Sequence, residues 1–431
     1  MLNAGSISAG DTAWVFVSSA LVLLMVPGLA LFYAGLVRPR AALNTVMMSL
    51  VALAVVSVQW TLVGYSLAFS SGSIVGNTSW FGLSGVGAAP GPYGATIPHL
   101  AFSIFQAMFA GITVALISGA VVERIRFSTF LIFAVAWTTF VYDPLAHWVW
   151  ANDGWLHKLG ALDFAGGTVV HISAGTAALV VAAFVGPRGD GGHTPGRPHN
   201  VVFTTIGAAL LWVGWFGFNA GSALAADGVA ANAFATTHVA AATAMVAWLL
   251  LERLRGGKPS GVGGATGAVV GLVAITPAAG YVTPMAALVI GAVAAAASHT
   301  AMRFRDRLRV DDALDVFACH GVAGIVGALL TGVFATTAVN SGGANGLLAG
   351  NARLLWVQAL AVVATIAFTA PVTAIVMAAL KATGALRVSI DAEADGVDVA
   401  EHGERAYADE LDSAGDALVF TSAPASRADA A

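Results

Sequence analysis

Two histidines occur in related strings within long apolar stretches of the chain. His171 begins HISAG (171–175), and His320 begins HGVAG (320–324). An ionisable side chain in an apolar stretch is costly to desolvate, so it marks a functional site by default. A neutral imidazole has one donor and one acceptor and titrates near neutral pH, so two in contact could share a proton and pass one along. The alternative is two separate histidines bonded to backbone carbonyls, and the residues alone do not decide between the two.

Asp163 precedes His171 by eight residues, in the string DFAGG. A carboxylate just before a helix accepts hydrogen bonds from the N–H groups of the first turn, and this is the direct role that we expect. The charge of Asp163 could also stabilise a cation at longer range.

Several side chains near the ends of apolar stretches could bind or admit a small cation. The ring faces of Trp150 and Phe105 attract cations. Phe109 and Phe218 could narrow a path below them, and the hydroxyl of Ser222 could accept a hydrogen bond near its mouth. Tryptophan is common at membrane interfaces, and phenylalanine is common within apolar spans. The residue types alone therefore favour packing roles for these aromatic side chains.

The composition defines the environment of these residues. Of 431 residues, 58% are hydrophobic and 10% charged, with a mean hydropathy of +0.82. A soluble domain has about a quarter of its residues charged, so a lipid bilayer is the expected solvent. The single cysteine, Cys319, excludes an internal disulfide framework. The net charge of −4 says little about partners, and no nucleic-acid partner is predicted.

Apolar stretches long enough to cross a bilayer recur along the chain. A helix needs about 20 mainly apolar residues to cross ~30 Å of hydrocarbon. Eleven such stretches are predicted, near residues 12–36, 42–70, 97–122, 127–150, 166–186, 200–223, 233–254, 261–280, 284–302, 314–338 and 353–380. We therefore predict an all-α polytopic membrane protein with eleven transmembrane helices.

Basic residues alternate with these spans and predict the orientation of the chain. They follow the odd-numbered spans: Arg38, Arg40, Arg124, Arg126, Arg188, Arg197, Arg253, Arg255, Lys258, Arg303, Arg305, Arg307, Arg309, Lys381 and Arg387. The other connections hold only Lys158 and Arg353. Because cytoplasmic loops carry the excess of lysine and arginine, we predict an outside N-terminus and a cytoplasmic C-terminus in the cell (plasma) membrane.

Recurring strings indicate an internal repeat. FYAG (32–35) in the first span is matched by FNAG (218–221) in the sixth, and the two histidine strings relate the fifth span to the tenth. Five spans per half is an odd number, so the halves at 12–186 and 200–338 are predicted to have inverted topology, with the substrate path between them. At 1.5 Å per residue, His171 lies roughly 12 Å beyond Asp163 and His320 roughly 15 Å from the opposite face, so both reach mid-depth.

The predicted membrane domain covers 1–386, and its eleventh span at 353–380 is followed by a cytoplasmic tail at 387–431. The tail is rich in Asp and Glu between 391 and 416. Such a composition is typical of a solvated segment. The alternative, which we predict for the mixed-charge residues 381–407, is that they lie along cytoplasmic loops that carry Arg188, Arg197 and the Arg303–Arg309 cluster.

Five strings in order resemble a known family. They are PGLALFYAGLVR (27–38), FQAMFAGITVALISGAVVERIRF (105–127), DFAGGTVVHISAG (163–175), GWFGFNAGS (214–222) and RVDDALDVFACHGVAGIVG (309–327). Over roughly residues 12–410, the chain resembles the ammonium transporters, the Amt branch of the Amt/Rh superfamily. Cys319 beside the second histidine is a modest departure from the family pattern.

The resemblance implies a homotrimer with one pore in each protomer. By motif match, Trp150, Phe105 and Ser222 fall on the ammonium recruitment site, Phe109 and Phe218 on the phenylalanine gate, His171 and His320 on the paired pore histidines, and Asp163 on the acid needed for transport. The implied substrate is ammonium or ammonia, with methylammonium as an analogue, and the implied cytoplasmic partner is a PII-class regulatory protein. The presence of Trp150 and Ser222 favours the Amt branch over Rh-type gas channels.

Three other functions are compatible with parts of this pattern. Two mid-membrane imidazoles could be the axial ligands of a haem. The protein could be an ammonium sensor that transports little, or a Rh-like channel for neutral gas. We predict a transporter and not an enzyme, with no cofactor and no metal site.

Overall fold

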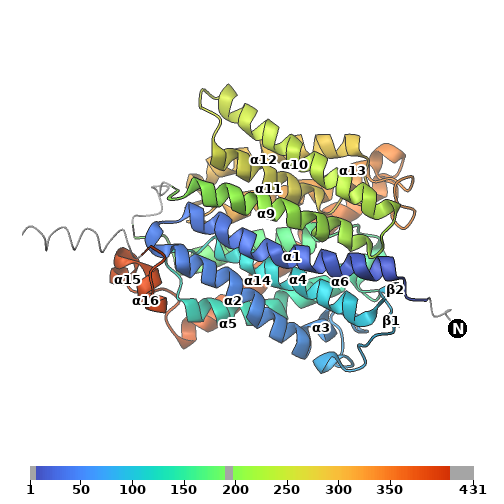
Figure 1. The fold of residues 1–431 in the computed structure, drawn as a ribbon, viewed down its shortest axis with the longest axis horizontal. Helices are drawn as coiled ribbons and strands as arrows, with labels where there is room; N and C mark the ends of the chain where they lie inside the picture. The colour runs from blue at the N-terminus through green and yellow to red at the C-terminus, as the bar shows by residue number, and fades with distance from the viewer. Residues whose placement is uncertain (1–5, 190–197, 408–431) are drawn as a thin grey trace, which may run out of the picture.

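Long apolar helices run side by side along most of the molecule (Figure 1). The computed structural model describes residues 6–189 and 198–407. Its spans are α1 (Ala9–Leu36); α2 (Ala42–Gln59) with η2 (Trp60–Gly64) and α3 (Tyr65–Phe69); α4 (His99–Ser118); α5 (Phe127–Trp137) with η4 (Thr138–Tyr142) and α6 (Asp143–Trp150); η5 (Gly167–Ile172) with α8 (Ser173–Val185); α9 (Val201–Ala220); α10 (Gly228–Leu254); α11 (Gly261–Ile275); α12 (Pro284–Leu308); η7 (Phe317–Val322) with α13 (Ala323–Phe334); and α14 (Ala352–Thr383). Within the described ranges, ten of these are long and apolar enough to cross a membrane. The prediction of a polytopic helical membrane protein is confirmed.

The eighth predicted span, at 261–280, is a shorter helix than the others. α11 has 15 residues, which span roughly 22 Å at the α-helical rise. It is buried along nearly its whole length, and its glycines let neighbouring backbones approach: a Cβ on Gly271 would lie 2.5 Å from the carbonyl oxygen of Ala240. Its Gly- and Ala-rich sequence therefore reflects close helix packing.

The pairs of spans that share sequence strings also pack against each other. α1 lies along α9, where a Cβ on Gly35 would meet the Asn200 carbonyl oxygen at 2.5 Å. The η5–α8 span crosses the η7–α13 span, and there a Cβ on Gly175 would lie 2.4 Å from the backbone nitrogen of Gly321. Glycine at these crossings brings the two halves of the predicted repeat into contact.

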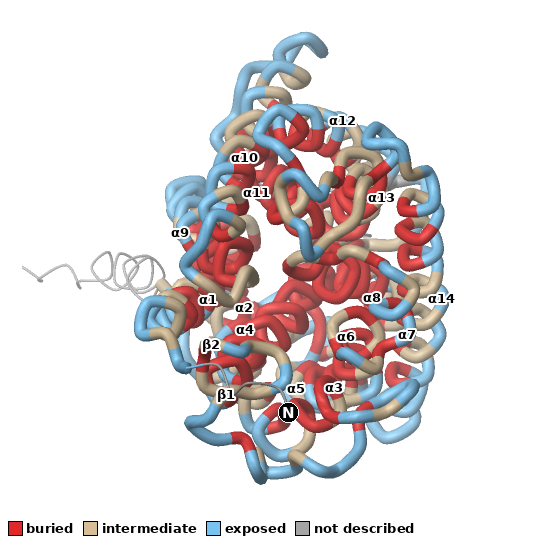
Figure 2. Tube along the Cα trace, turned by 90° about the vertical axis from the view of Figure 1, so that its right-hand side faces the viewer, coloured by how far each residue is buried: buried red, intermediate tan, exposed pale blue. Residues whose placement is uncertain are grey.

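Buried residues occupy the middle of the molecule, and exposed residues form its periphery (Figure 2). Many of the exposed side chains on the spans are large and apolar, including Leu62, Ile132, Val246 and Trp356. An outward apolar surface of this kind is expected where lipid is the solvent.

The connections add short elements, including a small sheet that the all-α prediction did not include. β1 (Pro90–Gly91) pairs antiparallel with β2 (Gly94–Pro98) ahead of α4. The remaining short helices are η1 (Pro39–Ala41), η3 (Phe81–Leu83), α7 (Trp155–Leu159), η6 (Gly221–Ala223) and η8 (Leu347–Ala349).

Residues 387–407 of the tail are folded against the starts of α2 and α5, so this part is not solvated and its charges lie along neighbouring connections, as the alternative predicted. The segment contains α15 (Ile390–Asp395) and α16 (Val397–His402). Glu393 and Asp398 are buried, and the Asp398 carboxylate accepts hydrogen bonds from the N–H groups of Leu43 and Asn44. Residues 408–431, Arg197 and the side chain of Arg305 lie outside the described part of the chain.

The tail also meets a buried ionic cluster at this end of the bundle. Arg124 is fully buried and donates to the Gly186 carbonyl and to the backbone of Asp311, while Arg188 pairs with the Asp311 carboxylate at 2.9 Å. Burial lowers the pKa of Arg124 to about 10. Arg124 is also bonded through its carbonyl oxygen to the backbone of Val388, so the cluster and the tail share one framework.

Candidate functional site

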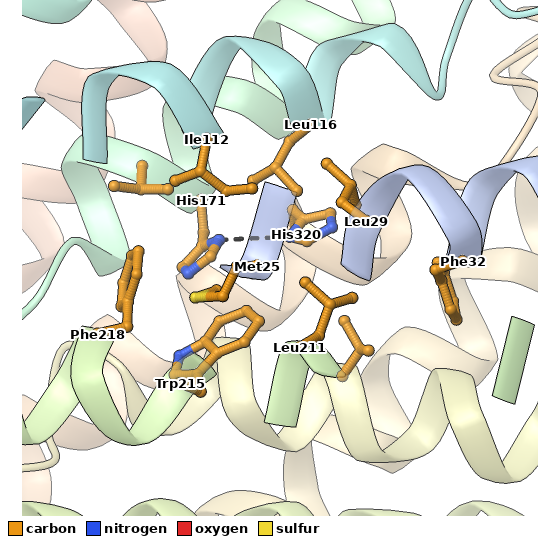
Figure 3. A pocket seen from close by; sticks show the side chains of 12 residues that line it. Met25, Leu29, Phe32, Ile112, Leu116, His171, Leu211, Trp215, Phe218 and His320 are labelled. Carbon is orange, nitrogen blue, oxygen red and sulfur yellow. Dashed lines mark hydrogen bonds between the residues drawn. The ribbon is translucent and has the colours of Figure 1, made fainter. Parts of the chain in front are cut away.

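The two histidines predicted to meet at mid-depth are in contact. The Nδ1 atoms of His171 and His320 lie 3.3 Å apart, and the rings are nearly parallel, with centroids 5.4 Å apart (Figure 3). Both side chains are buried, at 1% and 3% exposed. One Nδ1 must carry the hydrogen for the other to accept it, so the pair shares one proton along this contact. The Nε2 atom of His171 has no hydrogen-bond partner in the described part of the chain.

Each histidine lies in a π-helical turn, η5 for His171 and η7 for His320. Such turns are uncommon and recur at functional sites. The glycine four residues after each histidine lies at the crossing of the two spans: Gly175 faces Gly321, and a Cβ on Gly324 would lie 3.2 Å from that of His171. The recurring H-x-x-x-G pattern therefore places two imidazoles where two backbones touch.

Carboxylates cap both histidine-bearing turns. Asp163 accepts hydrogen bonds from the backbone N–H groups of Gly166, Gly167 and Thr168 at 2.8, 2.6 and 2.8 Å. This is the cap expected from DFAGG. At the opposite end, Asp312 accepts from the backbone of Val316 and Phe317 at 3.0 and 2.8 Å.

Asp312 was not singled out from the sequence, although a signal for it exists. It precedes His320 by eight residues, as Asp163 precedes His171. The D-x7-H spacing is thus part of the repeat, and it places a carboxylate cap at each end of the histidine pair.

Apolar side chains line the cavity beside the histidines (Figure 3). They are Met25, Leu29, Phe32, Ile112, Leu116, Val170, Leu211, Trp215, Phe218 and Val269. The cavity leaves ≈ 10 Å³ for the centre of a water-sized molecule. That is about the room needed for one such molecule. An unpaired cation would be strongly disfavoured there, whereas a neutral hydrogen-bonding molecule could contact the imidazoles.

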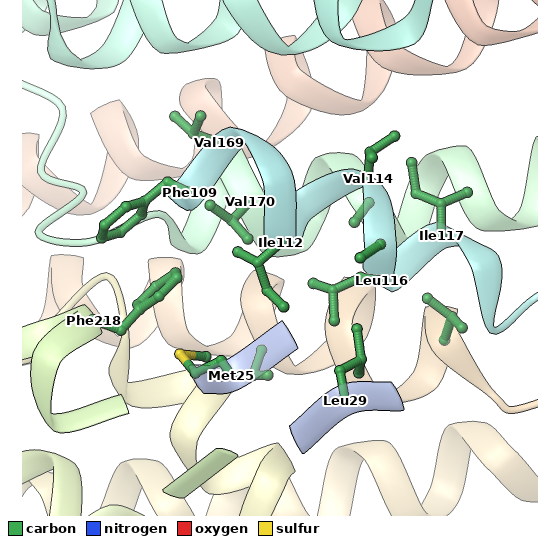
Figure 4. Close-up of a cluster of buried hydrophobic side chains, with 14 of the residues drawn as sticks. Met25, Leu29, Phe109, Ile112, Val114, Leu116, Ile117, Val169, Val170 and Phe218 are labelled. Carbon is green, nitrogen blue, oxygen red and sulfur yellow. The ribbon is translucent and has the colours of Figure 1, made fainter. Parts of the chain in front are cut away.

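Two stacked phenylalanines close this cavity on the side of Asp163. The rings of Phe109 and Phe218 have centroids 4.2 Å apart at an interplanar angle of 28° (Figure 4). Both side chains are buried, and the Phe218 ring lies 6.0 Å from that of His171. The stack must therefore move for anything to pass from the Asp163 side to the histidines.

Beyond the stack lies a vestibule of ≈ 550 Å³ whose lining includes Trp150, Asp163 and Ser222. The Trp150 indole N–H donates to the Asp163 carbonyl oxygen at 2.9 Å, which fixes the ring. The Ser222 hydroxyl donates to the Phe218 carbonyl oxygen at 2.8 Å, so its own oxygen can accept from a ligand.

Phe105 does not lie on the vestibule wall as the sequence suggested. Its side chain is fully buried and packs against the Phe109 ring, with centroids 4.9 Å apart. Phe109, one helical turn further along α4, contacts a second part of the vestibule together with Trp150 and Ser222. Phe105 therefore supports the ring that faces the vestibule.

The histidine geometry disfavours a haem between the rings. Two axial imidazoles lie on opposite sides of a haem iron at about 2 Å each, which would hold their nitrogens about 4 Å apart, wider than the 3.3 Å between the facing nitrogens here. The apolar cavity also has no volume for a porphyrin.

The fold and this site define a polytopic membrane protein with an occluded apolar path, closed by aromatic rings and containing a histidine pair. The model of the Ammonium Transporter Family matches residues 13–407, so the chain belongs to this family. It is 50% identical over 404 residues to an ammonium transporter of Bacillus subtilis, covering 93% of this chain and 99% of that one. It is 45% identical over 402 residues to an ammonium transporter of Archaeoglobus fulgidus, covering 93% and 100%.

The fold is also similar to that of solved structures. The crystal structure of Saccharomyces cerevisiae Mep2 superposes with a TM-score of 0.84 at 37% identity, covering 89% of this chain and 88% of that chain. A structure described as a sensor Amt protein superposes with a TM-score of 0.84 at 29% identity, covering 91% and 98%.

Proposed function

We propose that this protein carries ammonium across a membrane by deprotonating it and conducting ammonia past the His171–His320 pair. The observation that carries this proposal is the hydrogen-bonding contact between two buried imidazoles in an apolar cavity directly behind the Phe109–Phe218 stack. Membership of the ammonium transporter family supports the choice of substrate.

Ammonium first docks in the vestibule. The Trp150 ring face attracts the cation, the Ser222 oxygen accepts one of its N–H bonds, and the Asp163 carboxylate contributes its field. Phe109 offers a second ring face, and Phe105 holds Phe109 in place. Trp150, Ser222, Asp163 and Phe109 line the two parts of one vestibule, which supports their joint role, and Phe105 acts only through Phe109.

Ammonium gives up a proton before it enters the apolar cavity, since burying an unpaired cation costs several kcal/mol or more. As the phenylalanine stack opens, the N–H bond breaks and its proton passes either to the unpartnered Nε2 of His171 or to a water molecule in the vestibule, while ammonia moves past the stack. If His171 accepts it, the Nδ1 contact passes a proton on to His320. Potassium has no proton to lose and is excluded.

Two related functions differ from this one in measurable ways. In a neutral gas channel the proton stays outside and no charge moves. In an ammonium sensor, little substrate crosses at all. Uptake of labelled methylammonium into proteoliposomes, for the wild type and for His171→Ala and His320→Ala, tests the proposal. Wild-type uptake and potassium exclusion in both variants would overturn it.

We further propose that the protein is a homotrimer in which α9 and α10 face a second copy. His238 on α10 is exposed on the outside of the helix bundle. A polar side chain that faces hydrocarbon is costly, whereas a neighbouring protomer could pair with it. Cross-linking at His238→Cys tests this interface, and purely monomeric protein would contradict it.

The predicted orientation completes the proposal: N-terminus outside, C-terminus cytoplasmic, in the plasma membrane, with residues 1–386 as the transport domain and 387–431 as the tail. The folded part of the tail then lies at the cytoplasmic face, where a PII-class regulatory protein would dock. Its contacts with α2 and α5 support a regulatory role, because displacing it would disturb the ends of the spans. Deleting 388–431 should change transport or its regulation without preventing insertion, and a pull-down tests the partner.

A further inference from the structure

A cavity of ≈ 480 Å³ lies between the α1–α2 connection and the tail, away from the transport path. Figure 1 shows α15 and α16 beside the end of α1 and the start of α2. The α1–α2 connection contributes Arg38, Pro39 and Arg40 to the lining of this cavity. The tail contributes Asp395, Gly396, Asp398, Val399, Arg405, Ala406 and Tyr407. Two segments more than 350 residues apart in sequence thus build one concave site.

The walls of this cavity are fixed by specific contacts. Gly396, at φ +121°, touches Arg40, and a Cβ there would lie 2.8 Å from that of Arg40. The Asp398 carboxylate accepts hydrogen bonds from the first turn of α2, from the Leu43 N–H at 3.1 Å and from the Asn44 N–H at 2.7 Å. The Tyr407 hydroxyl is bonded to His199 at 3.0 Å, which holds its ring against the site.

The charges that remain in the cavity are two guanidinium groups and one carboxylate. Arg40 and Arg405 are exposed and form no ion pair with any other described residue. The Arg38 guanidinium is paired with Glu123, with Nε 3.8 Å from the carboxylate, and the Arg38 backbone N–H donates to the same carboxylate at 2.7 Å. Asp395 is exposed and, with the Asp398 carboxylate already bonded, is the acid left to receive a donor.

We propose that this cavity binds a nucleoside phosphate. The planar forks of Arg40 and Arg405 suit bidentate contact with phosphate oxygens. Asp395 can accept hydrogen bonds from ribose hydroxyl groups, and Tyr407 and Val399 offer surfaces for the base. The volume falls in the range of roughly 300–1,000 Å³ that small-molecule sites occupy.

Such a ligand would join the α1–α2 connection to the tail. It would stabilise the docked tail in proportion to its occupancy, because it binds the docked arrangement and not the separated one. Binding itself does not depend on the transport mechanism proposed above. Because the bound nucleotide would stabilise the docked tail, it would be a soluble effector in the regulatory role proposed for the tail.

The test is equilibrium dialysis of the purified full-length protein with radiolabelled AMP, ATP and inorganic phosphate. We expect saturable binding of the nucleotides, weakened about tenfold or more in Arg40→Gln and in Arg405→Gln, since each removes charged hydrogen bonds. Asp395→Asn should reduce the preference for nucleotides over inorganic phosphate. Arg353→Gln, an exposed arginine at the start of α14, is the matched control and should bind as the wild type does.

Hydrogen exchange of residues 390–407 gives a second readout. Nucleotide should slow exchange of these amides in the wild type and in Arg353→Gln but not in Arg405→Gln. Absence of saturable nucleotide binding, or unchanged binding in both Arg40→Gln and Arg405→Gln, would overturn the proposal. Equal binding of inorganic phosphate and AMP would overturn the assignment to a nucleoside phosphate. None of these results depends on whether ammonium is transported.

Discussion

Gly175→Ala should separate the two histidines without touching either of them. The new Cβ would lie 2.4 Å from the backbone nitrogen of Gly321 and 2.5 Å from its Cα. Because carbon atoms pack at about 3.5–4.0 Å, the two spans must move apart by roughly 1 Å. Gly321 follows His320 directly, so the Nδ1–Nδ1 distance would grow from 3.3 Å to beyond hydrogen-bonding range.

The expected cost to stability is that of overpacking, about 1–3 kcal/mol. The expected cost to function is a fall in ammonium-dependent flux of about tenfold or more, as for ~1.4 kcal/mol added to the barrier. The assay is flux into proteoliposomes, with monodispersity and thermal unfolding measured on the same preparation.

Gly228→Ala is the matched control for this substitution. Gly228 begins α10, and a Cβ there would meet nothing within 4 Å. It should leave both flux and stability unchanged. If Gly175→Ala is stable, transports at the wild-type rate and still excludes potassium, contact between the histidines is not required.

Three further predictions concern the vestibule, the caps and the ionic cluster. Trp150→Leu and Ser222→Ala should mainly weaken the apparent affinity for methylammonium, the former by ~0.5–2 kcal/mol, and an unchanged concentration dependence of uptake would contradict this. Both oxygens of Asp163 and of Asp312 accept N–H bonds, and an Asn has only one acceptor oxygen. Asp163→Asn should therefore lower both unfolding stability, by about 1–3 kcal/mol, and ammonium flux, whereas Asp312→Asn, remote from the vestibule, should lower stability without altering apparent affinity. Burial alone would raise the pKa of Asp311, but the hydrogen bonds and charges of Arg188 and Arg124 lower it overall below 3.8. The ionised carboxylate therefore stabilises the folded protein at neutral pH, and this stability is lost as the pH falls through the lowered pKa. Asp311→Asn should be less stable than the wild type at pH 7. Between about pH 5 and pH 3 it should lose less stability than the wild type does, as measured by thermal unfolding.

The positions of the spans and the meeting of the histidines could be predicted because length and depth follow from simple geometry. Eleven apolar stretches define the helices, and counting residues from each end places His171 and His320 at the same depth. The π-helical turns that carry them could not be predicted, since one extra residue in a turn leaves no mark in an apolar sequence.

The details that the sequence did not reveal depend on which face of a helix meets which neighbour. Phe105 and Phe109 are four residues apart on one face of α4, but a neighbouring segment covers the first: a Cβ on Gly221 would lie 3.0 Å from the Phe105 ring. In the tail, the acidic composition indicated solvation, yet Asp398 finds the N–H groups at the start of α2. Long-range partners of this kind are set by tertiary packing.

The most direct test of the central claim is the current evoked on a solid-supported membrane when ammonium is pulsed onto proteoliposomes. If the histidine pair passes the proton of ammonium, the wild type should give a transient positive current, and potassium should give none. His171→Ala and His320→Ala should abolish this current or lose the discrimination against potassium while remaining folded. Ammonium currents of wild-type size and selectivity in both variants would contradict the account.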